Sequence, residues 1–148
     1  MAPNSEPRSI HVLLTRYAES HRHPTNEWIH IVCVPVIVFT LLGILWSLHP
    51  LAALAASGLA LAYYWRLSRP FAFGMLAMSA VMLALLALMP PLTVLPVSLA
   101  IFVVAWIGQF IGHQIEGKKP SFMEDLRFLL IGPLFVLGFL YRRLRLAY

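Results

Sequence analysis

The chain has 148 residues, of which 60% are hydrophobic and only 11% are charged. A soluble domain carries roughly 25% charged residues, so this composition excludes an ordinary soluble protein and indicates an integral membrane protein. The formal net charge is +5. The cationic residues flank apolar runs without any RNA- or DNA-binding motif around them, which argues against a nucleic-acid partner. The single cysteine, Cys33, cannot form an intrachain disulfide.

Residues 9–20 predict a short helix at the membrane surface. Apolar side chains recur there at helical spacing, and polar ones occupy the other side. The apolar positions are Ile10, Leu13, Leu14 and Tyr17. Pro24 disfavours a continuation of this helix and suits the first turn of the next one.

Four apolar runs follow, and we predict that each spans the membrane. A membrane-spanning helix needs roughly 20 apolar residues. They cover residues 28–48, 51–65, 71–89 and 93–113. Because the breaks between them are short, we expect an up-down-up-down arrangement. The predicted fold is an all-α, integral membrane four-helix bundle that forms one domain over residues 1–148.

The last apolar run, residues 128–141, has only 14 residues and contains Gly132 and Pro133 in its middle. A run of this length is more typical of a re-entrant or interfacial segment than of a span, and we expect the Gly-Pro pair to break it. All eleven Lys and Arg then share one side of the membrane. The positive-inside rule makes that side cytoplasmic, together with the N-terminus. The very short loops favour a bacterial inner membrane.

A polar cluster precedes the first predicted span. It covers residues 17–35, YAESHRHPTNEWIHIVCVP, and contains three of the six histidines. Asn26 and His30 are four residues apart and therefore lie on one helix face. His21 and His23 fall in the turn before this helix.

A second polar cluster, residues 106–120, closes the fourth predicted span. Its sequence is WIGQFIGHQIEGKKP, and Gln109, His113 and Glu116 are spaced to share one helix face. Gly117 is expected to cap the helix. In an up-down-up-down bundle both clusters reach the same membrane face, so we expect His30 to lie close to His113.

Neutral imidazoles with amide and carboxylate neighbours suit a first-row metal such as iron, zinc, copper or nickel. His30 and His113 are the centre of the predicted site, and spacing alone leaves open whether His21 or His23 completes it. The alternative is a hydrogen bond between helices without a metal. Ionisable residues at membrane depth are costly, which favours a functional role.

Three neighbouring polar residues are candidate catalytic residues. Glu116 could bind the metal, orient a histidine or face water. Asn26 and Gln109 are better suited to orient a metal-bound imidazole, which usually donates its second N–H to an acceptor.

Three cations after the fourth span are candidates for holding a substrate carboxylate: Lys118, Lys119 and Arg127. The alternative is that they pair with Glu124, Asp125 or anionic lipid headgroups.

The two clusters together resemble a known family. The positions that carry the resemblance are Tyr17, His21, Asn26, His30, Pro35, Gln109-Phe110-Ile111-Gly112-His113, Glu116, Pro120 and Gly132-Pro133. This set spans nearly the whole chain and is similar to the membrane-embedded 2-hydroxy fatty acid dioxygenases, whose yeast member acts in phytosphingosine breakdown.

The resemblance implies Fe(II)-dependent α-oxidation, in which a 2-hydroxy fatty acid and O2 give an acid one carbon shorter. Carried over by position, the essential histidines fall on His21, His30 and His113. The implied partners are the fatty acid, O2 and membrane lipids, and a homo-oligomer is left open. The substrate's alkyl tail would lie among the apolar helices.

Two other functions compete with this interpretation. One is a b-type haem held by His30 and His113 in an electron-transfer protein. The other is a lipid-binding or scaffolding membrane protein whose histidines only connect helices.

Overall fold

The computed structural model describes residues 9–148, and the first eight residues of the predicted domain 1–148 lie outside the described part. Within residues 9–148 the chain forms helices only, and no strand is present. The all-α prediction is therefore confirmed. The elements are α1 (Ser9–Ala18), α2 (Pro24–Leu48), α3 (Pro50–Leu67), α4 (Arg69–Leu88), α5 (Pro91–Glu116), the 3-10 turn η1 (Ser121–Met123) and α6 (Phe128–Arg143).

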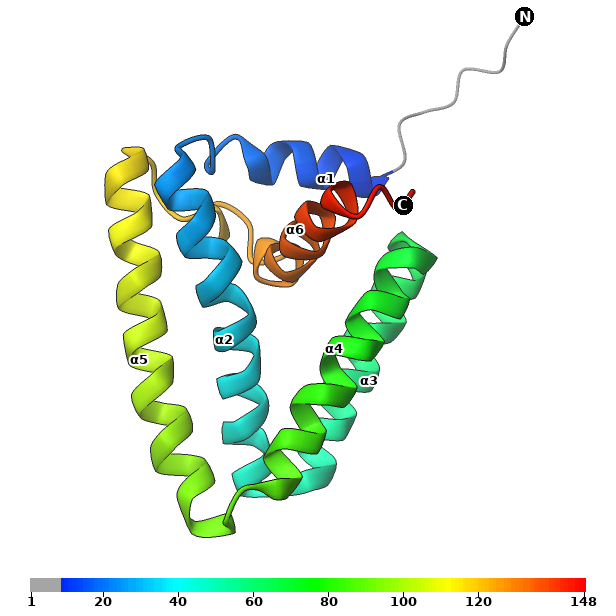
Figure 1. Cartoon of the computed structure of the whole chain (residues 1–148), viewed down its shortest axis with the longest axis vertical. Helices are drawn as coiled ribbons and strands as arrows, with labels where there is room; N and C mark the ends of the chain where they lie inside the picture. The colour runs from blue at the N-terminus through cyan, green and yellow to red at the C-terminus, as the bar shows by residue number, and fades with distance from the viewer. Residues whose placement is uncertain (1–8) are drawn as a thin grey trace, which may run out of the picture.

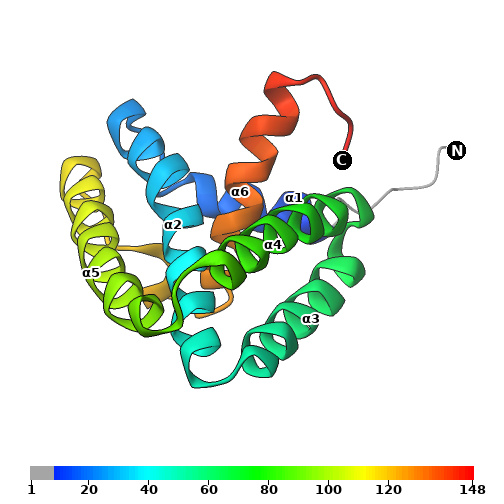
Figure 2. The same ribbon diagram turned by 60° about the horizontal axis from the view of Figure 1, so that its bottom comes forward.

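The four long helices run alternately in opposite directions (Figure 1). Helix α2 packs along α5, and α3 packs along α4. The two pairs meet at one end of the molecule and diverge towards the end that carries α1 and α6 (Figures 1 and 2). Three of the described helices, α2, α4 and α5, are long and apolar enough to cross a membrane. This agrees with an association of the protein with membranes.

The contact between α2 and α5 depends on small residues of α5. A Cβ atom on Gly112 would overlap Asn26 Oδ1, and one on Gly108 would come within 3.0 Å of Cys33 Sγ. The pair forms a Gly-x3-Gly spacing, which lets two helix backbones approach closely. The helix that carries His30 is therefore held directly against the end of α5.

The short helix α1 packs on α6 at the divergent end. Its apolar face is buried at Ile10, Leu14 and Tyr17, and these residues share a core cluster with Phe128 and Ile131 of α6. The helix ends at Ala18, before the end of the predicted range, and a turn leads from there to α2. This packing fixes the position of the turn that contains His21.

The expected break at Gly132 and Pro133 is wrong, because α6 runs through both residues as one helix. An internal proline removes one helical hydrogen bond and costs about 3 kcal/mol. Burial of the apolar face of α6 offsets this cost, at roughly 1.5–3 kcal/mol for each large side chain. The buried residues include Ile131, Leu134 and Phe135.

The ends of α2 and α5 determine the site. Helix α2 begins at Pro24, and the His23 side chain caps it by accepting a hydrogen bond from the Thr25 N–H. Helix α5 continues to Glu116, and Gly117 terminates it in the left-handed conformation, with φ of 73°. The predicted glycine cap is therefore confirmed.

Candidate metal centre

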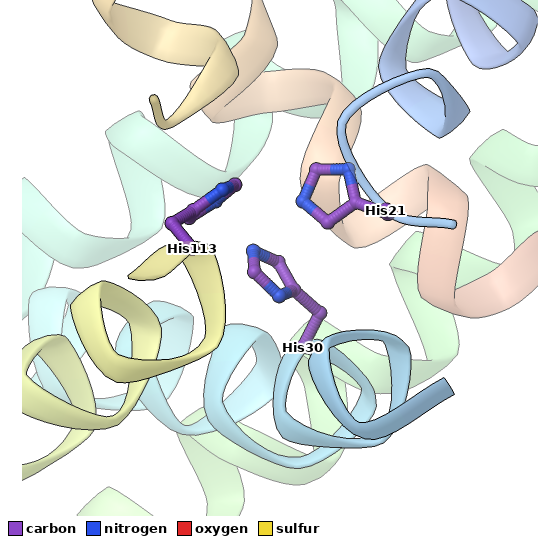
Figure 3. A group of neighbouring side chains, drawn as sticks. All are labelled: His21, His30 and His113. Atoms are coloured by element: carbon purple, nitrogen blue, oxygen red, sulfur yellow. The ribbon is translucent and has the colours of Figure 1, made fainter. Parts of the chain in front are cut away.

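Three histidines from three segments converge at the divergent end of the molecule. His21 comes from the turn after α1, His30 from α2 and His113 from α5, and their rings point towards one another (Figure 3). One ring nitrogen from each lies within 4.8 Å of the others. The ring centroids are 4.1 Å apart for His21–His30, 5.0 Å for His21–His113 and 4.8 Å for His30–His113. The group is close enough to bind a metal ion.

Backbone carbonyls fix the orientation of two of the rings. His21 Nδ1 lies 2.7 Å from the Tyr17 carbonyl oxygen, and His30 Nδ1 lies 3.0 Å from that of Asn26. A carbonyl oxygen only accepts hydrogen bonds, so each Nδ1 carries the proton and donates it. Nε2 of both rings is then left with a lone pair. Metal-binding histidines characteristically have this outer hydrogen bond.

The inner nitrogens fit a metal ion. His21 Nε2 and His113 Nδ1 are buried, and neither has a hydrogen-bond partner within residues 9–148. A buried polar atom without a partner costs roughly 1–3 kcal/mol. Coordination of a cation would satisfy such nitrogens, and no hydrogen-bond donor within residues 9–148 does so.

The charge state of His21 also suits coordination. Burial lowers the pKa of His21 to about 4, and the proximity of His113 contributes in the same direction. The ring is therefore neutral at pH 7. A neutral imidazole is the form that binds a metal.

Glu116 holds the turn that carries His21. Its carboxylate accepts hydrogen bonds from the backbone N–H of Arg22 at 3.0 Å and of His23 at 2.7 Å. It thereby ties the end of α5 to the start of α2, where a negative charge also interacts favourably with the helix dipole. The carboxylate is directed to the backbone of this turn, and Glu116 is not part of the three-histidine group.

Asn26 connects the same parts from α2. Its side-chain amide donates to Glu116 Oε2 at 3.2 Å and to the Ser20 carbonyl at 3.1 Å. Its backbone carbonyl accepts from His30. Asn26 and Glu116 therefore connect the segments that carry the three histidines, whereas His23 caps α2 at the surface, outside the group.

An apolar cavity of about 310 Å³ begins at His30 and His113. On α2 its wall follows His30, Val34, Val38 and Leu41, and on α5 it follows Phe102, Trp106, Gln109 and His113. Each stripe covers eleven residue steps, or about 16 Å of helix. Parts of η1 and α6 close the remaining side. Leu41 and Leu129 on the cavity wall are 46% and 48% exposed.

A family model described as 2-hydroxy-palmitic acid dioxygenase Mpo1-like matches residues 8–144. The chain belongs to this family. The resemblance inferred from the two clusters is thereby confirmed, and the family name describes a dioxygenase of 2-hydroxy fatty acids. No curated protein and no solved structure matches the chain.

The three candidate substrate cations of this family member lie away from the cavity at the histidines. Lys118 and Lys119 line a second, surface cavity of about 320 Å³, which adjoins the first at Ser121 and Phe128. The Lys118 ammonium donates to the Glu19 carbonyl at 2.9 Å. Arg127 forms an ion pair with Asp125 at 2.6 Å. Helix α5 ends before these residues. They therefore lie at the surface and do not continue the helix face that carries His113.

Three residues near the site had no role predicted from the sequence of this family member. The Tyr17 ring stacks on His21, with centroids 4.2 Å apart. Trp106 and Ser121 line the cavity. The spacing of Tyr17 to His21 and of Trp106 to His113 is helical and could have indicated the first two, whereas Ser121 lies in a turn without such a pattern.

Proposed function

We propose that this protein is a membrane-bound, Fe(II)-dependent dioxygenase that shortens 2-hydroxy fatty acids by one carbon. The observation that carries the proposal is the convergence of three buried histidines at the end of a long apolar cavity. The family name gives the substrate class independently.

His21, His30 and His113 would hold the iron. Imidazole nitrogens suit Fe(II), and two of the three rings already have the outer hydrogen bond that fixes their ligand atom. When bound, the iron supplies coordination positions for the 2-hydroxy acid and for O2. Asn26 and Glu116 keep the histidines in place, and Gln109 lies beside them in the cavity wall.

The overall reaction balances with O2 as the only oxidant. R–CH(OH)–COOH and O2 give R–COOH, CO2 and H2O: the C1–C2 bond breaks, C2 becomes the new carboxyl carbon, and C1 leaves as CO2. The substrate loses four electrons, and one O2 accepts four. No further reductant is needed, so we propose CO2 as the product of the lost carbon.

The cavity would bind the alkyl tail. An extended chain advances about 1.25 Å per carbon, given C–C bonds of about 1.5 Å. The cavity stripes of about 16 Å therefore match about 13 carbons beyond the head of the acid.

We further propose a single membrane domain over residues 1–148, with α2–α5 as four spans and α6 as a re-entrant or interfacial helix. The surface helix α1 and the metal site would face the cytoplasm of a bacterial inner membrane. The support is the position of the cationic segments, which share the end of the molecule that carries the histidines (Figure 1).

The test is metal content and product analysis on protein purified without oxygen. We expect one iron per chain and conversion of 2-hydroxypalmitate, labelled with carbon-13 at C1, to labelled CO2 and the acid one carbon shorter. His30→Ala and His113→Ala should each lower metal affinity and turnover more than about 100-fold. Full metal content and full turnover in either variant would contradict the assignment.

The same preparation separates the competing functions. A Soret absorption band would favour a b-type haem protein. A protein without bound metal, and without turnover after iron is added, would instead favour a lipid-binding or scaffolding role.

A further inference from the structure

The cavity wall contains no cation to receive a fatty acid carboxylate. Among the described residues that line it there is no lysine or arginine. A carboxylate that enters an apolar cavity loses its hydration, and this loss is costly unless hydrogen bonds replace the water. The wall must therefore supply neutral donors if an acid binds there.

Three neutral donors of the wall are unpaired. Gln109 Nε2, Trp106 Nε1 and Ser121 Oγ are buried and have no hydrogen-bond partner within residues 9–148. Gln109 and Ser121 are only 4% and 5% exposed. Buried donors of this kind are uncommon in folded proteins, and each one calls for a partner.

These donors belong to one region of the cavity, next to the histidines. Gln109 and Trp106 precede His113 on the same face of α5, by one and two helical turns. Ser121 lies in η1, and the neighbouring Phe122 ring packs on Trp106 with centroids 5.2 Å apart. The turn is therefore held over this face of α5.

We infer that Gln109, Trp106 and Ser121 bind the carboxylate of the 2-hydroxy acid as neutral hydrogen-bond donors. This inference rests on the proposed function and adds the residues that recognise the acid. A carboxylate has about four lone-pair sites, so it can accept these three bonds while the fourth site and the 2-hydroxyl remain available for chelation.

Neutral donors also fit the charges of the site. The three histidines are the group that could hold the metal, and Glu116 is occupied by backbone N–H groups. The substrate carboxylate would therefore be the anion that balances the metal charge. A lysine or arginine in its place would hold the product acid as firmly as the substrate, whereas uncharged donors allow the product, which lacks the chelating 2-hydroxyl, to leave.

The test measures binding to metal-free protein, so that it does not depend on turnover. Palmitate, 2-hydroxypalmitate and the methyl ester of 2-hydroxypalmitate are titrated into protein in lipid nanodiscs, by calorimetry. We expect Gln109→Leu and Ser121→Ala each to weaken binding of both acids about tenfold, as for a lost hydrogen bond to a charged group. Ester binding should weaken much less, because the ester carbonyl is a neutral acceptor and its hydrogen bonds are weaker than those of a carboxylate.

Trp106→Phe serves as a third variant because it removes the N–H and keeps an aromatic ring. Gln114→Leu, at an exposed position of α5, and Ser98→Ala, at a buried position outside the cavity, are matched controls and should bind as the wild type does. Metal content and thermal midpoint are measured for every variant to verify that the site is intact.

The outcomes separate this inference from the proposed function. Acid binding that is equal in the wild type and all three donor variants would overturn the inference, as would equal losses for acid and ester, even if the wild type turns over its substrate. Selective loss of acid binding in a protein that proves inactive with iron would support the inference and contradict the proposed function.

Discussion

Glu116 and His113 are about one helical turn apart, yet their side chains make different contacts. His113 directs its ring into the group of three histidines, whereas the Glu116 carboxylate binds the backbone of Arg22 and His23. These contacts hold the adjoining His21 in place. A residue that positions a ligand and a residue that is a ligand should respond differently to added metal.

We therefore expect Glu116→Ala to reduce metal affinity without abolishing the site. The free energy of unfolding should fall by about 0.5–1.5 kcal/mol, because the exposed backbone N–H groups of Arg22 and His23 and the part-buried Asn26 amide lose their acceptor. The affinity for iron should fall about 10–100-fold. The metal content should therefore be low at low iron and recover when iron is raised. His113→Ala should not recover. Glu124→Ala, an exposed carboxylate, is the control, and a Glu116→Ala protein with the same affinity as the wild type would argue against positioning.

At the scale of the helices, the site depends on how closely α2 approaches α5. Asn26 and His30 of α2 lie opposite Gly112 and His113 of α5. A side chain on Gly112 would overlap Asn26 Oδ1. Any separation of the two helices would move His30 away from His113. The stability of this contact and the geometry of the metal centre are therefore linked.

Gly112→Ala should destabilise the protein by about 1–3 kcal/mol, the usual cost of adding a methyl group to a tightly packed contact. It should also lower metal content. Gly58→Ala is a matched control because nothing lies within 4 Å of the added Cβ, and alanine is favoured over glycine in a helix by roughly 1 kcal/mol. Thermal midpoint and iron stoichiometry are the measurements. A Gly112→Ala protein as stable and as fully loaded as Gly58→Ala would contradict the linkage.

At the scale of the whole molecule, positive charge collects at the end that carries the histidines. The described Lys and Arg residues fall on α1, the following turn, the α3–α4 junction, the segment after α5 and the last turns of α6. These segments lie at one end, and the α2–α3 and α4–α5 turns lie at the other (Figure 1). The positive-inside rule predicts that the first end faces the cytoplasm, as in the orientation proposed above.

Single cysteines introduced into a Cys33→Ser protein should report this orientation. We expect Lys119→Cys and Arg69→Cys to be protected from a membrane-impermeant thiol reagent in intact cells, and His49→Cys to be labelled. Permeabilised cells, in which all three should react, are the control. Labelling of both Arg69→Cys and His49→Cys in intact cells would show that α3 does not cross the membrane, and labelling of Arg69→Cys alone would reverse the proposed orientation.

Periodicity and topology were sufficient to predict that His30 and His113 meet, because both lie at helix ends that alternate in direction. They could not decide between His21 and His23, since that choice depends on the contact of Glu116 with the turn, between residues more than 90 positions apart. The continuous α6 was also missed, because the packing that offsets the cost of Pro133 comes from α1 and α4. The role of Trp106 depends on η1, which packs on it.

The half-exposed Leu41 and Leu129 on the cavity wall have a kinetic consequence. Under the proposed function and membrane orientation, a cavity that opens there between the helices would receive its substrate from the surrounding lipid rather than from water. The quantity that drives the reaction is then the mole fraction of 2-hydroxy acid within the leaflet. Diluting the acid with inert phospholipid at constant bulk concentration would therefore slow the reaction. The apparent KM would then be a concentration of the acid within the leaflet rather than in water.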